Sequence, residues 1–294
     1  MRRVAREPSN EELIQKLFQE GDRLRRSTVD EILRRGTELI PELGTMCMDR
    51  LLWTEDLPGW WAPVHATYLL GAMSSEEVIL PLLSALRWSD AYDNEWVTED
   101  LPAMFGKIGG VAIEPLLAVA SDQSAGWSAR SIALDSLTAI AVVSPQHEER
   151  LLRFVDGHLK NKNEHPGVRR AAAIILLDLR VTRMHDALIA FAKEEEQRAN
   201  EFEDYRPVFV STDVDRELAI PVRSEEYYRR DWLTFYHDEE IHRRQLAWQQ
   251  EDQAEAKSRF GPGVGEREAV AEGLRLCPCG SGRMYRHCCW GKLH

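Results

Sequence analysis

The sequence predicts an all-α protein whose main part is a helical-repeat solenoid. Apolar residues recur at the three- and four-residue spacing of amphipathic helices through most of the 294 residues. One set of these helices carries leucines at similar places, so that their offsets are 34, 35 and 37 residues: Leu82, Leu116, Leu151 and Leu188. Paired helices at a nearly fixed period are typical of solenoids, in which each pair stacks on the next.

The first part of the chain contains start and stop signals for short helices. Ser9 and Glu12 have the spacing of a capping box, and the helix that they open is expected to stop at Gly21. A second helix runs from Val29 to Arg35 and stops at Gly36. Pro41 then suits the first turn of a third helix. Its apolar residues Leu43, Met46, Cys47 and Leu51 follow at helical spacing, which favours a core role for Cys47 over that of a reactive thiol.

The repeats follow. The first helices of the pairs are expected at Trp61–Gly71, Trp96–Gly106, Trp127–Ile140 and Val168–Leu179. The sequence resembles HEAT or armadillo-like repeats, on the evidence of Pro81 and Pro115 in the first turns of two second helices and of the alanine-rich start of one first helix, Ala171 to Ala173. The period is shorter than the roughly 40 to 47 residues usual for HEAT units and nearer the 34 of tetratricopeptide repeats, whose sequence pattern is missing. We assign residues 1–198 to this HEAT-like domain.

Tryptophans mark the repeats. Trp61, Trp96 and Trp127 begin successive first helices, and Trp88 lies in a loop just before one of them, among acidic residues. If the repeats stack in register, these four side chains form an aromatic and acidic edge that could bind a partner peptide. The alternative is that the rings fill the joints between repeats.

The helical period breaks after Glu196. Residues 199–223 contain two prolines and are expected to form an extended linker or strap. Ser224 then caps a predicted long helix, 224–260, with a dense set of aromatic residues on its apolar side, which implies docking. Gly261-Pro262-Gly263 is a helix breaker, and residues 266–294 form a separate small module.

Four of the five cysteines lie in this module as Cys277, Cys279, Cys288 and Cys289. Their spacing is that of one tetrahedral metal site, and four thiolates with no open position predict a structural Zn²⁺ ion. Glycines in the turn between the pairs would let backbone N–H groups face the anionic sulfur atoms. Buried thiols, a redox pair or a disulfide are the alternatives, and His287 could replace one ligand.

The string C-P-C-G-S-G-x-x-Y-x-x-C-C resembles the SEC-C motif, the zinc-binding tail of the SecA translocation ATPase that also occurs on unrelated bacterial proteins. The resemblance covers about twenty residues. In that family the tail docks on an acidic chaperone and on anionic surfaces. By resemblance, the candidates for such contacts here are Arg283, Tyr285, Arg286 and Lys292.

Composition limits the function classes. The net charge of −12 disfavours nucleic-acid binding by the whole surface. The sequence has neither the apolar run of a signal peptide nor a stretch of about 18 to 20 apolar residues that could span a membrane, so we expect a reducing cytoplasm. Gly106-Lys107 lacks the rest of a phosphate-binding loop, and Glu239-x-x-His242 is half of a di-iron motif at most.

The sequence therefore favours a non-catalytic cytoplasmic adaptor, in which the helical repeats bind one protein and the zinc-binding tail docks on an acidic partner. A first alternative is an RNA- or ribosome-associated protein, since a small basic zinc module with Tyr285 or Trp290 could stack on bases. A second is an enzyme on a helical solenoid, such as a base-excision glycosylase, but that class needs a basic cleft.

Overall fold

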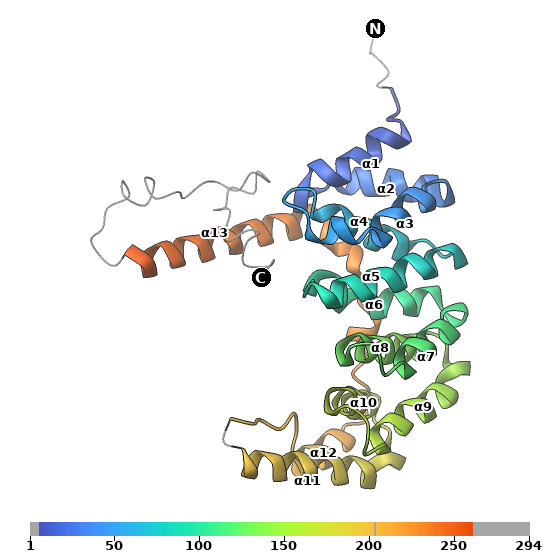
Figure 1. Cartoon of the computed structure of the whole chain (residues 1–294), viewed down its shortest axis with the longest axis vertical. Coiled ribbons are helices and arrows are strands. Elements are labelled where there is room, and N and C mark those ends of the chain that lie inside the picture. The colour runs from blue at the N-terminus through green and yellow to red at the C-terminus, as the bar shows by residue number, and fades with distance from the viewer. Residues whose placement is uncertain (1–5, 203, 261–294) are drawn as a thin grey trace. The chain divides into compact units, whose positions relative to one another are not determined.

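The computed structural model describes residues 6–202 and 204–260, with side chains described as far as residue 255 (Figure 1). These residues form helices and turns, and no β-strand occurs among them. The chain divides into two compact units. The first contains the described residues up to Thr98 together with those from Asp231 onward, and the second is Glu99–Arg230. The first unit is thus built from two segments that are far apart in the sequence.

The helices of the first unit are α1 (Asn10–Gln19), α2 (Arg26–Arg35), α3 (Ile40–Met48), α4 (Trp61–Ala72), α5 (Ile79–Ala91) and α13 (Asp238–Phe260). Its 3₁₀ turns are η1 (Gly21–Arg23), η2 (Gly36–Leu39), η3 (Arg50–Thr54), η4 (Glu76–Val78) and η9 (Trp232–Tyr236). Helix α6 (Glu95–Ile108) begins in this unit and continues into the second.

The further helices of the second unit are α7 (Ile113–Ser121), α8 (Trp127–Val143), α9 (Glu148–Lys160), α10 (Pro166–Asp178), α11 (His185–Glu201) and α12 (Ser211–Leu218). Its 3₁₀ turns are η5 (Gly110–Ala112), η6 (Pro145–His147), η7 (Thr182–Met184) and η8 (Tyr227–Arg229).

The helix signals of the first segment are confirmed, except that the third helix, α3, ends at Met48, so that Leu51 lies in η3 and is 73% exposed. Ser9 Oγ accepts the Glu12 N–H at 3.2 Å, and Glu12 Oε2 accepts the Ser9 N–H at 2.7 Å, which completes the capping box. Helix α2 ends where Gly36 adopts a φ of 61°, a backbone conformation that glycine reaches without steric cost. Cys47 is fully buried, as expected of a core residue, and burial raises the pKa of its thiol to about 12.

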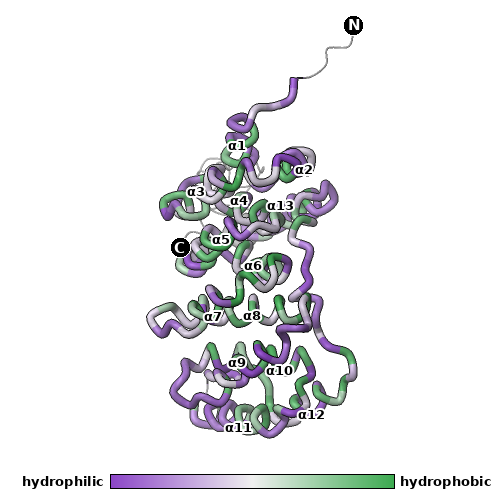
Figure 2. Tube along the Cα trace, turned by 90° about the vertical axis from the view of Figure 1, so that its right-hand side faces the viewer, coloured by the Kyte–Doolittle hydropathy of each residue, from purple (hydrophilic) through white to green (hydrophobic). Residues whose placement is uncertain are grey.

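The predicted helix pairs are also confirmed, as α4–α5, α6–α7, α8–α9 and α10–α11. A 3₁₀ turn precedes each second helix, and these turns begin at Glu76, Gly110, Pro145 and Thr182, which are again 34, 35 and 37 residues apart. Within the second unit α8 packs against α7, α9 and α10, so consecutive pairs lie side by side (Figure 1). The hydrophobic stretches that these helices bury can be followed in Figure 2.

The predicted linker 199–223 is more ordered than expected. Helix α11 continues to Glu201, and the eight-residue helix α12 packs against α10 and α11 with Val214 buried. At its start, Asp213 Oδ2 accepts the Val210 N–H at 3.0 Å. An eight-residue helix spans too few turns to show a clear apolar period, and packing supplies its stability.

The predicted long helix 224–260 is wrong in its first half, because α13 begins only at Asp238. The preceding aromatic residues divide between the two units. Tyr228 is buried in the second unit, whereas Trp232, Phe235 and Tyr236 are buried in the first. The run is not one helix, because Asp231 begins the separate 3₁₀ turn η9 by accepting the Leu233 N–H at 3.1 Å. The expectation that these rings dock is confirmed by their burial.

Buried polar groups fix the returning segment to α4 and the first turns of the chain. His65 is fully buried, with Nδ1 2.9 Å from Tyr236 Oη and Nε2 2.8 Å from the Gly21 carbonyl oxygen. Trp232 Nε1 donates to the Tyr68 carbonyl at 2.9 Å. The Arg244 guanidinium lies 3.7 Å from the centre of the Phe235 ring and donates to the Asp22 carbonyl at 3.1 Å.

This arrangement predicts a pH dependence. Burial lowers the pKa of His65 to about 4, and the charge of Arg244 acts in the same direction, while the hydrogen bond to Gly21 opposes them. The unfolded chain therefore takes up the proton first, and the first unit should lose up to about 3 kcal/mol of stability as the pH falls from about 6.5 to 4. Urea unfolding followed by tryptophan fluorescence at each pH measures this loss.

Two variants control that measurement. His65→Gln cannot titrate, so its stability, although lower at pH 7, should change much less over this range. His242→Gln, at an exposed position on α13, should keep the slope of the parent protein. A His65→Gln protein with the parent slope would show that other groups cause the acid sensitivity.

Candidate interaction groove

An open groove of about 700 Å³ lies in the second unit. It runs between the first turn of α8, one side of α10 and the end of α11 with the loop that follows. Its lining residues are Trp127, Ser131, His165, Pro166, Gly167, Arg170, Ala171, Ile174, Arg198, Glu201, Phe202, Tyr205 and Val208. On α10, Pro166, Arg170 and Ile174 are four residues apart and therefore share one face of the helix.

Four large apolar side chains of the groove are exposed to solvent. The exposed fractions are 51% for Trp127, 40% for Ile174, 60% for Phe202 and 44% for Val208. Single exposed apolar residues are common, but a group of them around one hollow is typical of a surface that contacts another molecule.

Trp127 is exposed and at the same time held in place. Its indole stacks on the His165 ring, with 5.7 Å between ring centres and 5° between planes. The other neighbour is Gly167, where a Cβ atom would come within 3 Å of three indole atoms. Glycine is thus required at this position for the ring to lie where it does. The indole presents a fixed aromatic surface, which costs little conformational entropy when a partner binds.

His165 is in turn positioned by a buried ion pair. Its backbone N–H donates to Glu164 Oε1 at 2.7 Å, and its Nδ1 accepts the Gly167 N–H at 3.1 Å. The Glu164 carboxylate receives both Arg130 Nη groups, at 2.8 and 2.6 Å, and lies 2.9 Å from His158 Nδ1. The side chains of Glu164 and Arg130 are only 4% and 5% exposed.

Electrostatics keep this carboxylate ionised. Burial alone would raise the pKa of Glu164, but hydrogen bonds from Arg130, from the His165 N–H and from His158 outweigh it and lower the pKa to about 2. The Glu164 carboxylate therefore keeps the charge that pairs with Arg130 at ordinary pH values.

Two arginines occupy equivalent places in successive first helices. Arg130 Nε donates to the carbonyl of Ala120 at the end of α7, and Arg169 Nε donates to the carbonyl of Leu159 at the end of α9. Each arginine is the fourth residue of its helix and spans ten residues back. This pair was not predicted from the sequence, although an arginine at the fourth position of both helices was a usable signal.

The acidic run in α11 was also missed, since such a run usually indicates a solvated face. Instead, the Glu195 carboxylate is fully buried and accepts from Tyr205 Oη at 2.6 Å and from Arg170 Nε at 3.0 Å. Arg198 Nη1 lies 3.4 Å from the same carboxylate. Two guanidinium groups of the groove therefore share one buried negative charge.

The other tryptophans proposed for an aromatic edge lie elsewhere. Trp61 is 4% exposed and packs between Trp60, Trp96 and Phe235, inside the first unit. Trp96 is half-buried and contacts the Trp248 ring. For these two residues the packing favours the alternative that the rings fill joints between helices.

Trp88 lies within α5, not in a loop as predicted. It is half-buried, with the Arg87 guanidinium 4.8 Å and the Arg50 guanidinium 5.7 Å from its ring centre. It belongs to the first unit, whereas Trp127 belongs to the second. Of the four predicted edge residues, Trp127 is therefore the one that lines the groove.

The predicted zinc ligands lie outside the described residues, and so do the tail residues Arg283, Tyr285, Arg286 and Lys292. In the described part of the chain, no group of three or more His, Cys, Asp or Glu side chains could hold a metal ion. Glu239 and His242 are both exposed on α13, as expected of a solvated face. The zinc site remains a prediction.

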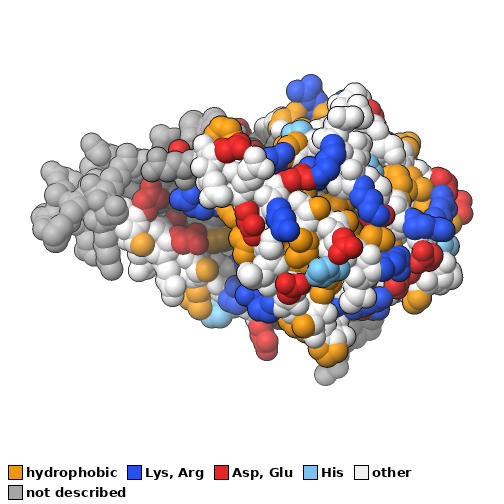
Figure 3. All heavy atoms as spheres, turned by 90° about the horizontal axis from the view of Figure 1, so that it is seen from below, with side chains coloured by type: hydrophobic (Ala, Val, Ile, Leu, Met, Phe, Trp, Pro, Cys, Tyr) orange, Lys and Arg blue, Asp and Glu red, His pale blue; other side chains and the backbone are white. Residues whose placement is uncertain are grey.

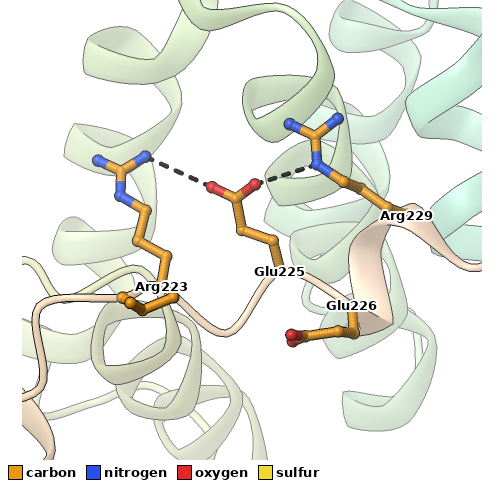
Figure 4. A pocket seen from close by; sticks show the side chains of 5 residues that line it. Arg223, Glu225, Glu226 and Arg229 are labelled. Carbon is orange, nitrogen blue, oxygen red and sulfur yellow. Dashed lines mark hydrogen bonds and ion pairs between the residues drawn. The ribbon is translucent and has the colours of Figure 1, made fainter.

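A second hollow, of about 670 Å³, lies at the segment before η8 (Figure 4). Its two arginines are already engaged. Arg223 donates to both oxygens of Glu148, at 3.0 and 2.8 Å, and Arg229 donates to Glu225 at 3.0 Å and to the Val142 carbonyl at 2.7 Å. Donors that are already paired offer little to a ligand, so the groove is the better candidate site.

Near this hollow, two carboxyl groups have raised pKa values. Burial, with the charge of Asp178 adding to it, raises the pKa of Asp135 to about 8. Burial raises that of Asp178 to about 6, although its hydrogen bond from Tyr228 Oη, 3.3 Å long, acts in the opposite direction. Tyr228 is buried, and the Ser224 N–H donates to the Asp178 carbonyl at 2.9 Å. These contacts show that the segment from Ser224 to η8 packs on α8 and α10.

No single helix in the described ranges is both long and apolar enough to cross a membrane. The pair Glu95–Ile108 and Gly110–Ser121, bent by 117°, passes the same test of length and composition when taken together.

Searches of protein-family models, of curated proteins and of solved structures find no match to this chain. The groove is therefore interpreted from its own residues.

The ion pair beneath His165 predicts a large and local loss of stability. Glu164→Gln removes the buried charge that Arg130 requires, and the second unit should lose about 3 to 5 kcal/mol. As a control, Glu114→Gln breaks the exposed pair with Arg150, whose side chains are 73% and 52% exposed, and should cost no more than about 1 kcal/mol. Urea unfolding followed by circular dichroism compares the two. Equal losses would contradict the role given to Glu164.

Two glycine substitutions test how Trp127 is held. Gly167→Ala should displace the indole from His165 and shift its NMR signal, because the new methyl group overlaps the ring. Gly157→Ala, on α9, meets no atom within 4 Å and should stabilise the protein by about 0.5 to 1 kcal/mol without moving that signal. An unchanged indole signal in Gly167→Ala would show that the ring is not fixed there.

Proposed function

We propose that this protein is a non-catalytic, cytoplasmic interaction adaptor. Its body is a HEAT-like helical solenoid whose groove binds one protein, and its tail is a SEC-C-type module, folded around one structural Zn²⁺ ion, that docks on an acidic partner. The observation that carries the proposal is the groove, in which the exposed Trp127 indole is fixed beside other exposed apolar side chains.

The helix pairs support the solenoid. Their 3₁₀ turns recur every 34 to 37 residues, and in the second unit successive pairs pack side by side. The equivalent hydrogen bonds of Arg130 and Arg169 to the ends of α7 and α9 repeat one junction twice, as expected of a repeat architecture.

The tail proposal depends on sequence. Cys277, Cys279, Cys288 and Cys289 supply four thiolates, which is a complete ligand set for a structural zinc ion. From Arg275 to the end, the chain contains four lysines and arginines and no acidic residue, so the partner surface is expected to be acidic.

Zinc content tests the metal directly. The purified protein should contain one mole of zinc, and Cys288→Ser should release it, because a tail without a core depends on the ion to fold. Helical circular dichroism should remain nearly unchanged, since the helices of the two units do not require the ion. Zinc that is retained after both Cys288→Ser and Cys277→Ser would contradict the ligand set.

Paired variants test the adaptor role. Proteins cross-linked in cells to the intact chain, to Trp127→Ala and to a chain truncated at Gly273 should show two separable losses, one for each change. Each partner is then purified and bound to all three proteins. If both changes remove the same partner, or neither removes any, the chain does not join two proteins through these sites.

The same experiment addresses RNA binding. Basic and acidic side chains are interspersed over the molecular face seen in Figure 3, which offers no broad basic field for a phosphate backbone. The tail itself has only four lysines and arginines beside four cysteines, which is little positive charge for RNA, so partners that depend on it should survive ribonuclease treatment. Their loss would favour the RNA- or ribosome-associated alternative.

A further inference from the structure

The groove combines its apolar side chains with positive charge that is only partly neutralised. Arg170 and Arg198 share the single buried carboxylate of Glu195. That carboxylate also accepts a hydrogen bond from the Tyr205 hydroxyl at 2.6 Å, so most of the hydrogen bonds that it can accept are already made. Arg198 is therefore only weakly paired with Glu195.

Arg198 is the more available of the two guanidinium groups. Its side chain is 34% exposed, and its contact with Glu195, at 3.4 Å, is long for a charge-assisted hydrogen bond. Within the described residues its Nε and Nη2 donate to no other group. These two N–H groups form a side of the planar fork that binds a carboxylate with two parallel hydrogen bonds.

The opposite charge lies at the rim. Glu201 is one helical turn beyond Arg198 on α11, exposed, and accepts from Gln197 Nε2 at 2.8 Å. The acidic residue nearest to Trp127 along the sequence is Asp122. Its carboxylate accepts hydrogen bonds from the Ser124 N–H at 2.9 Å and from the Ser124 hydroxyl at 2.6 Å. Asp122 does not line the groove, so Glu201 is the acidic residue of its lining.

We propose that the groove binds an extended peptide segment in which an acidic side chain is flanked by bulky apolar ones. The carboxylate pairs with Arg198, and the apolar side chains contact Trp127, Ile174 and Phe202. This inference rests on the proposed interaction function and names the chemistry of the partner.

A basic peptide fits the site less well. A cation could lie over an indole face, but one face of Trp127 is covered by His165, and the groove lining already contains two guanidinium groups. An acidic residue would instead accept from the open donors of Arg198, while the exposed apolar side chains supply most of the buried area.

The test uses the full-length protein and two fluorescent ten-residue peptides that alternate leucine and phenylalanine with either glutamate or lysine. Binding is measured by anisotropy at ~0.15 M salt, and the Trp127 indole NMR signal identifies the site. Two charge variants of opposite sign are compared, Arg198→Gln and Glu201→Gln, both at side chains in contact with solvent.

The glutamate peptide should bind at least about tenfold more tightly than its lysine counterpart and should shift the Trp127 signal. Arg198→Gln should weaken its binding about tenfold, by removing a charge-assisted contact, and Glu201→Gln should strengthen it about two- to threefold, by removing a like charge. Gly167→Ala should weaken it as well, because the indole is displaced.

Other outcomes separate this inference from the proposed function. If both peptides bind equally and shift Trp127, or the two charge variants act with reversed signs, the groove is a docking site and the acidic partner is wrong. If neither peptide shifts Trp127, the acidic-peptide inference is overturned, and the partners found by cross-linking then decide whether the groove takes part in binding at all.

Discussion

The buried ion pair between Arg130 and Glu164 is the constraint on which the groove depends. It fixes the turn before α10, that turn sets the plane of the His165 ring, and the ring supports the Trp127 indole. A buried pair of this kind adds little net stability compared with apolar residues, yet losing one partner is costly. The ion pair here serves to position the Trp127 indole, because apolar packing alone would not hold that side chain in a solvent-exposed place.

In the first unit, buried polar contacts attach a segment that is distant in the sequence. Residues 231–248 return to the first helices through buried polar groups that have partners, including His65 with Tyr236 and Arg244 with the Asp22 carbonyl. Buried hydrogen bonds demand one geometry, whereas apolar contacts tolerate several. These hydrogen bonds therefore give α13 a defined start, and the cysteine-rich tail follows α13 along the chain.

Local sequence signals predicted the helices well, because capping boxes, glycine stops and apolar periods act within a few residues. They failed where tertiary contacts decide. The aromatic run from Tyr227 to Tyr236 has a helical pattern, yet its rings belong to two units and the helix is interrupted. In the groove, Trp127 was a sequence candidate, but Arg198 and Phe202 were not, since they approach Trp127 only through the packing of α8, α10 and α11.

The chain has a net charge of −12, whereas two arginines line its groove, and this contrast affects which partners it would select. A chain of net charge −12 repels an acidic partner at long range, but at physiological salt the repulsion is screened beyond roughly 8 Å. Inside the groove, two guanidinium groups share one carboxylate, and their short-range attraction acts after that repulsion is overcome. Association would then be slow for acidic chains in general. The lifetime of the complex would depend on an acidic residue placed correctly beside apolar ones. The surface would then bind selected partners and would not bind acidic proteins non-specifically.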